Sequence, residues 1–268
     1  MSQTNQLATV IVPAFNAERT IADTLTSVEL QRYRPIELIV IDDGSTDGTA
    51  EKCAAWAASN RNSSLTYRYV RKPNGGLGSA RNAGIAASKG RYIQFLDSDD
   101  LIHPDKIERT IATMIADGSK IGVCQVEYIS YNYKTENLAE QRATPNEYSY
   151  TDLSTPYIAS IRWDAHHPVY DREVLDCVGG FRENLAVGQG FEWVARCRCK
   201  KFKTSFLPFR YYYYRQAVPG RLTSSNARRI ASNRLYIIIY IERLLRAHHS
   251  RNHDELVALI EYTLRTSY

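Results

Sequence analysis

Cysteine is scarce in this chain and never falls in a spacing typical of metal sites. The 268 residues contain five cysteines, an odd number, and no pair has the C-x-x-C spacing. This pattern predicts neither a disulfide framework nor a zinc site. We therefore expect reduced thiols, at Cys53, Cys124, Cys177, Cys197 and Cys199.

Long hydrophobic runs are also absent. No run approaches the roughly 20 apolar residues that cross a bilayer. The residues from Met1 to Gln6 lack the charged, apolar and small-residue regions of a secretory signal. Hydrophobic residues make up 44% and charged residues 24% of the chain, a balance that argues against disorder. The sequence therefore predicts a cytoplasmic globular protein, with one large domain or one domain and an appendage.

A strong net charge is lacking too, because the formal charge is only +5. Lysine and arginine nevertheless gather in two stretches, Arg196–Lys203 and Arg228–Arg251. Such stretches could favour an anionic substrate, a lipid surface or nucleic acid. No known nucleic-acid-reading motif accompanies them, so we expect no nucleic-acid partner.

The first 120 residues have a regular alternation of short apolar runs and amphipathic stretches. Ala8–Val12 and Ile36–Ile41 are β-branched runs typical of buried strands, and Glu18–Leu30 between them has apolar residues at helical spacing. The pattern continues with strands at Leu65–Arg71 and Arg91–Leu96 and helices from a Thr46 cap to Ala58, at Gly78–Ser88 and at Pro104–Ala116. Alternating strands and helices predict a parallel sheet covered on both faces.

Polar side chains follow the predicted strands at their carboxyl ends. Asn16 follows the first strand, Asp42 and Asp43 the second, and the sequence D-S-D-D at Asp97–Asp100 the later one. Open sheets of this kind bind ligands beyond the carboxyl ends of their strands. We therefore expect these residues to converge on one crevice.

The D-S-D-D group is the sharpest local feature. Asp97 and Asp99 occupy alternate positions and can both turn toward one divalent cation, which prefers carboxylate oxygens and substrate phosphates. The alternative is a solvated turn, in which Asp100 only caps the helix that begins near Pro104. The residues alone leave both interpretations open.

Two other turns also allow two interpretations. Asp42-Asp43-Gly44-Ser45 is either a tight strand-to-helix turn or a site for a base and ribose. The glycine-rich loop Asn74–Gly78, followed by Arg81, allows a diphosphate to approach the backbone closely at a helix start. This loop lacks the spacing of a P-loop, so alone it is weak support for a nucleotide site.

Together and in this order, four segments resemble the family 2 glycosyltransferases of the GT-A fold. They are VIVPAFN at Val10–Asn16, IVIDDGSTDGT at Ile39–Thr49, NGGLGSARNAG at Asn74–Gly84 and GRYIQFLDSDD at Gly90–Asp100, with Pro104 after the last. The resemblance covers about residues 8 to 115. It implies an α/β fold of GT-A type, Rossmann-like, with a mostly parallel central sheet.

The resemblance also implies roles for single residues. Pro13, Phe15, Asp42 and Asp43 would line the nucleobase and ribose pocket, and Arg81 would contact the donor sugar or phosphate. Asp97 and Asp99 match the metal motif of the family and would hold Mg²⁺ or Mn²⁺, which neutralises the diphosphate. The full predicted nucleotide-sugar set is Pro13, Phe15, Asn16, Asp42, Asp43, Arg81, Asp97 and Ser98.

The second half resembles the family more loosely. The segment His166–Leu185 is similar to the family's acceptor-side segment, which ordinarily leads to a Glu-Asp pair that supplies the general base. Here Gln189-Gly190 takes the place of that pair, in the stretch Gln189–Trp193. Three interpretations stay open. Glu192 acts as the base, which is our catalytic prediction; or Asp164, His166 or His167 does; or the protein binds a donor and is catalytically silent.

The sequence pattern in the last part of the chain predicts two amphipathic helices, Ala227–Ala247 and Asp254–Thr266. They could lie on an anionic membrane that carries a lipid-linked acceptor, or pack on the domain or a second copy. We expect a glycosyltransferase domain over residues 1–222, with its acceptor side at about 120–222, and a helical extension over 223–268.

Arg215 or Arg221 could supply positive charge near the diphosphate. In the tyrosine run Tyr211–Tyr214, alternation predicts that half of the rings are core.

The sequence therefore predicts a metal-dependent enzyme that moves a sugar from a nucleoside diphosphate, with UDP expected, to a hydroxyl on a glycan or lipid-linked acceptor. The resemblance implies inversion at the sugar. The enzymatic rival is a sugar-nucleotide nucleotidyltransferase, for which we expect a glycine-rich signature and a basic residue after the first strand. Pro13-Ala14-Phe15-Asn16 does not provide it.

Overall fold

The protein is described by a computed structural model at residues 6–59, 64–130, 132, 164–185 and 188–216. In the first half, strands and helices alternate as the sequence predicts, except that a short unpredicted strand, β5, follows β4. The elements are β1 (Ala8–Ala14), α1 (Ile21–Glu29), β2 (Ile36–Asp42), α2 (Thr49–Ser59), β3 (Leu65–Arg71), α3 (Leu77–Ala87), β4 (Tyr92–Phe95), β5 (Leu101–Ile102) and α4 (Lys106–Asp117). The second half adds β6 (Ile121–Ile129), β7 (Val169–Asp171), α6 (Arg172–Val178), α7 (Gln189–Cys199) and β8 (Thr204–Arg215).

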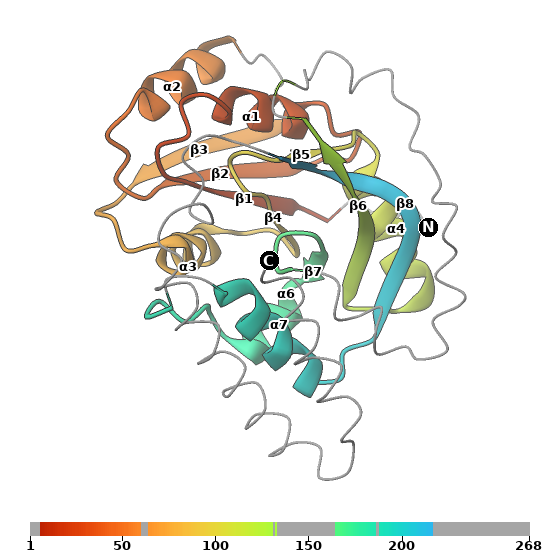
Figure 1. Cartoon of the computed structure of the whole chain (residues 1–268). Helices are drawn as coiled ribbons and strands as arrows, with labels where there is room; N and C mark the ends of the chain where they lie inside the picture. Colours follow the sequence, from red (N-terminus) through yellow and green to blue (C-terminus); the bar gives the residue numbers. More distant parts are fainter. Residues whose placement is uncertain (1–5, 60–63, 131, 133–163, 186–187, 217–268) are drawn as a thin grey trace.

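The strands of the described residues belong to one sheet in the order β3-β2-β1-β4-β7-β6-β8-β5 (Figure 1). The first four strands in this order are parallel, with Val10 of β1 opposite Leu38 of β2. The short β7 runs antiparallel to both of its neighbours, whereas β6 and β8 are parallel to each other. The carboxyl ends of β1, β2 and β4 therefore lie along one edge of the sheet.

Helices cover the two faces of the sheet (Figure 1). Alternate side chains of β1 pack against different sets of helices. Val10 and Val12 pack into one apolar cluster with residues of α1, α2 and α4. Ile11 points the other way, into a cluster with Phe95 and Trp193 that includes residues of α6 and α7. Because both faces are covered, every residue of β1 and β2 is buried.

Two helix caps differ from the predictions. The helix α2 starts at Thr49 rather than after a cap at Thr46, because the carboxylate of Asp47 accepts the backbone N–H of Thr49 at 3.1 Å. Asp100 does not cap α4, which starts at Lys106. Its carboxylate is buried and accepts hydrogen bonds from the sheet instead. A short polar side chain near a predicted helix start identifies the region of the cap better than the capping residue.

The strands of the second half are longer than the sequence predicts. On either side of residue 209 the sequence predicts two strands, Ser205–Pro208 and the tyrosine-dense Arg210–Arg215, and in the structure they form the single strand β8. Its register against β6 shifts on both sides of Gln125, so that a bulge absorbs the interruption at Pro208. The sequence also predicts strand-like pieces around Glu127–Tyr133, and the strand in this region is β6, which starts earlier, at Ile121, and ends at Ile129.

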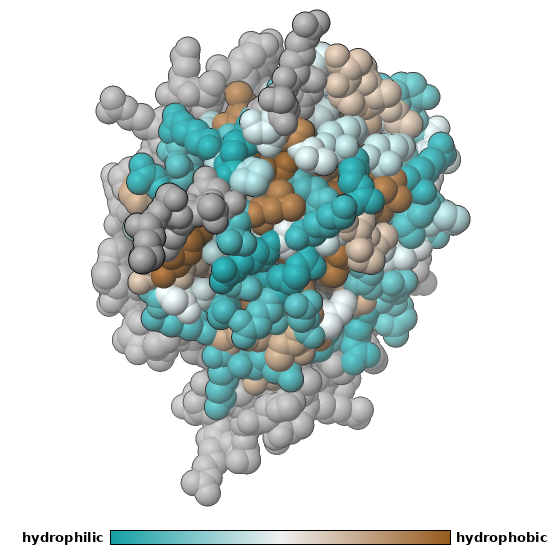
Figure 2. Space-filling view, turned by 180° about the vertical axis from the view of Figure 1, so that it is seen from behind, coloured by the Kyte–Doolittle hydropathy of each residue, from teal (hydrophilic) through white to brown (hydrophobic). Residues whose placement is uncertain are grey.

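The remaining predictions for the end of the chain lie outside the described residues. These are the helices at 227–247 and 254–266, Arg221, and the boundary at residue 222. Within the part of the chain that the structure describes, no helix combines the length and apolar character needed to span a bilayer. On the face shown in Figure 2, hydrophilic residues predominate and hydrophobic residues form separate patches between them.

Candidate active site

The polar residues after β1 and β2 lie side by side, as the parallel register requires. The backbone N–H of Asp43 donates to Ala14 O at 2.8 Å, which continues the ladder past the strand ends. The Asn16 N–H donates to Ser45 Oγ at 3.0 Å, and the Thr46 N–H donates to Asn16 Oδ1 at 2.8 Å. Of the predicted base-pocket residues, Pro13 is buried and the Phe15 ring is exposed at this edge.

Asp42 is a buried carboxylate that is held ionised by its hydrogen bonds. Burial alone would raise its pKa. The Ser45 backbone and side chain and the Tyr69 hydroxyl donate to it, and together with the more distant Arg71 they outweigh burial and lower the pKa. Asp42 is therefore a fixed negative charge at the end of β2.

Asp43 shapes the glycine-rich loop. Its carboxylate accepts the Lys72 ammonium at 2.6 Å and the backbone N–H groups of Gly75 and Gly76 at 3.0 and 2.7 Å. Gly44, next to Asp43, has a φ of +81°, and a Cβ there would lie 3.0 Å from the Asn74 backbone nitrogen. The turn after β2 and the loop before α3 are therefore one packed unit, which explains why both need glycine.

The helix α3 places Arg81 against the sheet. Gly78 and Gly84 flank Arg81 at a spacing of three residues, on one side of the helix. A Cβ on Gly84 would lie 2.2 Å from Ile11 Cγ2, and one on Gly78 would lie 2.9 Å from Arg182 O. Because both positions lack a side chain, α3 lies close to β1 and to the loop at Arg182.

Arg81 is buried, with 2% of its side chain exposed, and it points at the end of β4. One terminal nitrogen donates to Asp97 Oδ1 at 2.9 Å, and the guanidinium lies over the Phe181 ring at 5.2 Å. Its Nε has no hydrogen-bond partner among the described residues. A buried guanidinium with spare donor capacity is suited to an anionic ligand.

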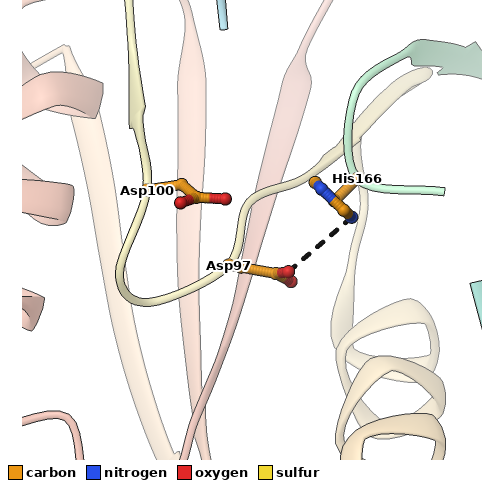
Figure 3. Close-up of side chains that lie close together, drawn as sticks. All are labelled: Asp97, Asp100 and His166. Atoms are coloured by element: carbon orange, nitrogen blue, oxygen red, sulfur yellow. Dashed lines mark ion pairs between the residues drawn. The ribbon is translucent and has the colours of Figure 1, made fainter. Parts of the chain in front are cut away.

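Asp97, Asp100 and His166 form a cluster at the end of β4 (Figure 3). Each offers one ligand atom, and these atoms lie within 4.8 Å of one another. The His166 Nδ1 lies 3.6 Å from Asp97 Oδ2. Asp99, which we predicted as the second metal ligand, is partly buried and does not belong to this cluster. Ser98 lies between Asp97 and Asp99 in the sequence, and its carbonyl accepts a hydrogen bond from the Thr24 hydroxyl at 2.9 Å.

The cluster has the chemistry of a divalent cation site. Two neutral groups donate to the Asp100 carboxylate, the Tyr212 hydroxyl at 2.8 Å and the Arg215 backbone N–H at 3.0 Å. Asp97 is partly exposed, so a ligand can reach it from solvent. Two carboxylates and an imidazole suit Mn²⁺, and carboxylates suit Mg²⁺. The residues present therefore fit the predicted cation, which Asp97, Asp100 and His166 would hold.

His166 comes from a turn, residues 164–167, that is fastened to the sheet by buried side chains. The Gln94 amide donates to His166 O at 2.7 Å, Lys106 Nζ donates to His167 O at 2.9 Å, and the Tyr170 hydroxyl donates to Ala165 O at 3.0 Å. Burial lowers the pKa of Lys106. We did not predict Lys106 or Gln94, because both look like ordinary surface residues in the sequence.

The two histidines of the turn differ in their surroundings. Burial, followed by the electrostatic effect of the neighbouring His166, holds the pKa of His167 well below its ordinary value. His167 Nδ1 accepts the backbone N–H of Asp164 at 3.3 Å, so the proton of the neutral ring is on Nε2. The His167 ring therefore stabilises the turn by accepting a hydrogen bond from its backbone, whereas the His166 ring faces Asp97.

Asp164 starts the same turn, and its carboxylate lies beside α7. Its side chain is 25% exposed, and its Oδ1 lies 3.8 Å from His166 Nδ1. Burial raises the pKa of the Asp164 carboxyl, and the positive charge of Arg81 offsets only part of this rise. A Cβ on Gly190, in the first turn of α7, would lie 1.7 Å from Asp164 Oδ1.

Glu192, our predicted general base, has no exposed side-chain surface. Its Oε1 accepts from Arg182 Nε and from Arg196 Nε, both at 2.9 Å, and its Oε2 accepts from Arg196 at 3.0 Å. The contact with Arg182 ties α7 to the preceding loop, whereas Arg196 lies on α7 itself. The catalytic role of Glu192 stays a prediction.

The tyrosine run is more deeply buried than alternation predicts. Tyr211, Tyr212 and Tyr213 are all buried, and Tyr214 is partly buried. Arg215 is also buried, and its guanidinium donates to Asp23 at 2.8 Å. Its backbone N–H, rather than its charge, reaches the cluster, through Asp100.

The family model for glycosyl transferase family 2 matches residues 9–179. This match spans more than half of the chain, including β1 to β7. The chain belongs to glycosyl transferase family 2.

Two curated relatives of the family are similar over part of the chain. Glycosyltransferase GlyA of Streptococcus pneumoniae is 36% identical over 126 residues, which are 46% of this chain and 17% of that protein. The Escherichia coli protein WfgD, named a UDP-Glc:alpha-D-GlcNAc-diphosphoundecaprenol beta-1,3-glucosyltransferase, is 33% identical over 147 residues, or 55% of this chain and 54% of that one. The chain thus spans from about a sixth to about half of the length of these relatives.

Solved structures of glycosyltransferases show the same fold. TarS from S. aureus, in complex with UDP-GlcNAc, aligns with a TM-score of 0.74 and 20% identity over 95% of this chain and 71% of that one. Mannosyltransferase PcManGT from Pyrobaculum calidifontis, in complex with GDP-Man and Mn2+, aligns with a TM-score of 0.70 and 18% identity over 99% and 74%. The predicted GT-A fold is confirmed.

Proposed function

We propose that this protein transfers a sugar from a nucleoside diphosphate donor, UDP-linked, to a hydroxyl of a glycan or lipid-linked acceptor, with inversion and with a divalent cation. The observation that carries the proposal is the grouping at the end of β4. A buried Arg81 with a spare donor and the cluster of Asp97, Asp100 and His166 face the same edge of the sheet. Mixed charge of this kind suits a diphosphate with its cation.

The donor would lie across the carboxyl ends of β1, β2 and β4. The exposed Phe15 ring offers an apolar surface for a base, and the buried Pro13 lies two residues earlier in β1. Asn16, Asp42 and Asp43 fix the turns that border this surface, and Ser98 and Asp99 adjoin the diphosphate position. Because Asp43 and Asp42 are already bonded by neighbouring groups, we assign them mainly to the shape and charge of the pocket.

The cation would be held by Asp97, Asp100 and His166, with Asp99 as the further predicted ligand. When bound, it neutralises negative charge on the diphosphate as the sugar departs. Arg81 adds positive charge from the other side of Asp97. These residues of the chain therefore orient the leaving group and stabilise its charge.

The acceptor and the location are proposed from the relatives. WfgD is named for a UDP-linked donor and a diphosphoundecaprenol acceptor, and TarS was solved in complex with UDP-GlcNAc. A lipid-linked acceptor would place the protein peripherally at the inner face of the membrane. The C-terminal residues 223–268 would then contact the membrane or a second copy, next to a donor half at about 8–115 and an acceptor half at about 120–222.

The proposal is tested by mass-detected transfer from a panel of UDP- and GDP-sugars to lipid-linked acceptors, with and without Mn²⁺. We expect cation-dependent transfer from a UDP-sugar, and a loss of at least about 100-fold for Asp97→Asn. Asp176→Asn, which removes an exposed carboxylate on α6, is the matched control and should keep the wild-type rate. Donor binding without turnover of any acceptor would instead favour a catalytically silent donor-binding subunit.

A further inference from the structure

The first turn of α7 lacks the acidic side chains that the family resemblance leads one to expect. Gln189 and Gly190 stand there, and the amide of Gln189 donates to Leu185 O at 2.8 Å, in the segment before α7. Neither residue can accept a proton from an acceptor hydroxyl. A transferase with this sequence needs a base from another position, and a carboxylate is the kind of base that the family resemblance implies.

The structure places such a carboxylate at that position. An ideal Cβ on Gly190 would lie 1.7 Å from Asp164 Oδ1 and 2.8 Å from Asp164 Cγ. The carboxyl group of Asp164 therefore fills the space into which a side chain at position 190 would project. The two positions are 26 residues apart in the sequence, so no local pattern relates them.

We propose that Asp164 is the catalytic residue that takes the proton of the acceptor hydroxyl, in the space left by the missing side chain of Gly190. This inference rests on the proposed function, because it names the base of that transfer.

Asp164 has access to solvent and adjoins the proposed leaving-group site. A quarter of its side chain is exposed, whereas that of Glu192 is fully buried. Its Oδ1 lies 3.8 Å from His166 Nδ1, and the same nitrogen lies 3.6 Å from Asp97. Glu192 is bound by Arg182 and Arg196, and both bonds would have to break before it could reach an acceptor.

The turn that carries Asp164 is rigidly placed. Its three carbonyls at Ala165, His166 and His167 accept from buried side chains of β7, β4 and α4. The Asp164 backbone is held as well, since its N–H donates to His167 Nδ1 and its carbonyl accepts from the His167 N–H at 3.2 Å. A base that is fixed by its backbone is pre-positioned for an incoming hydroxyl.

The step balances as an ordinary displacement. The acceptor oxygen forms a bond to the anomeric carbon while the bond from that carbon to the β-phosphate oxygen breaks. The bonding electron pair leaves with the nucleoside diphosphate, and the hydroxyl proton goes to the Asp164 carboxylate. Asp164 returns the proton to solvent after the product departs.

The first test is Asp164→Asn, which keeps the shape and removes the proton acceptor. We expect kcat to fall by about 100-fold or more, with the KM for the donor and the Kd for UDP with Mn²⁺ within about twofold of wild type. Transfer that stays within about twofold of wild type overturns the inference. Loss of donor binding together with turnover also overturns it, because the role would then be structural.

The second test moves the carboxylate back to α7. Asp164→Gly combined with Gly190→Asp removes the steric conflict and restores a carboxylate near the same space, and Asp164→Gly with Gly190→Ala is the matched control. We expect the first pair to transfer at least about tenfold faster than the second, at equal thermal stability. Equal rates for the two pairs overturn the inference. A wild-type protein that transfers nothing from the donor panel counts against the proposed function itself.

Discussion

The buried aspartates at this site are held in place mainly by the hydrogen bonds that their carboxylates accept. Asp42, Asp43 and Asp100 are all buried carboxylates, and each is bonded by backbone or hydroxyl donors that adjoining elements supply. Buried charge of this kind is costly unless it is paired or hydrogen-bonded. The hydrogen bonds therefore fix the positions of these carboxylate groups before any ligand arrives, which favours binding of a cation together with an anionic substrate.

Replacing Tyr69 by Phe should make the protein less stable in a pH-dependent way. The Tyr69 hydroxyl donates to Asp42 and helps to lower the pKa of that carboxyl. A lowered pKa contributes stability above the unfolded pKa of about 4 and loses it as the pH falls through the folded pKa. Urea unfolding should show Tyr69→Phe about 1–2 kcal/mol less stable at pH 7, with the difference shrinking toward pH 3.

The control for this prediction is Tyr128→Phe, which removes a hydroxyl from an exposed ring. We expect it to match wild type across the whole pH range. A Tyr69→Phe deficit that stays constant from pH 7 to pH 3 would show that Asp42 is not its source.

At the level of elements, α3 is the helix whose position matters most for the donor side. It carries Arg81, and its glycines set how near it lies to β1. Gly84→Ala should destabilise the protein by about 1–3 kcal/mol, because the new methyl group overlaps Ile11 Cγ2. It should also weaken UDP binding, since Arg81 moves with the helix.

A double-mutant cycle with Ile11→Ala tests the cause. If the overlap with Ile11 is responsible, the two changes together should cost at least about 0.5 kcal/mol less than the sum of the single changes in urea unfolding. Ala86→Val, on the exposed side of α3, is the control for altered helix propensity. Additive costs in the cycle would point to a different origin.

The elements also show what the sequence can and cannot predict. The β-branched runs and turn residues predicted β1, β2, β3 and α3 to within a few residues, because both faces of that half are covered and the local pattern is strong. Pairing of β7 between β4 and β6 had no local signal, since three residues carry little periodicity. The continuity of β8 was hidden by Pro208, which a bulge accommodates.

The same contrast holds for the site. Asp42, Asp43, Arg81 and Asp97 follow strand ends or a glycine loop, so motif and topology together predicted them. Two contacts, that of His166 with Asp97 and that of Asp164 with Gly190, depend on where the fold places the turn 164–167. Such contacts between distant positions follow from tertiary packing and have no trace in a single sequence.

For the whole molecule, ligand binding should appear as stabilisation. UDP with Mn²⁺ at about 100 times its Kd should add about 2.7 kcal/mol to the free energy of unfolding. For a domain of this size we expect a Tm increase of about 5–10 °C. Differential scanning fluorimetry should show this for wild type and much less for Asp97→Asn, whereas excess EDTA should remove the contribution of Mn²⁺. An equal shift with and without Mn²⁺ would contradict a cation at the cluster.

The central place of β7 has a consequence for biosynthesis. The strand is made after β5 and β6, yet it fills the gap between β4 and β6. While the ribosome is still translating the region before residue 164, β4 has an open hydrogen-bonding edge, and Asp97 lacks its histidine neighbour. The N-terminal half can assemble early, but the edge of the sheet at β4 is complete only after β7 has been synthesised. We therefore expect a product truncated before residue 164 to be prone to aggregation through the open edge of β4, and to lack transferase activity.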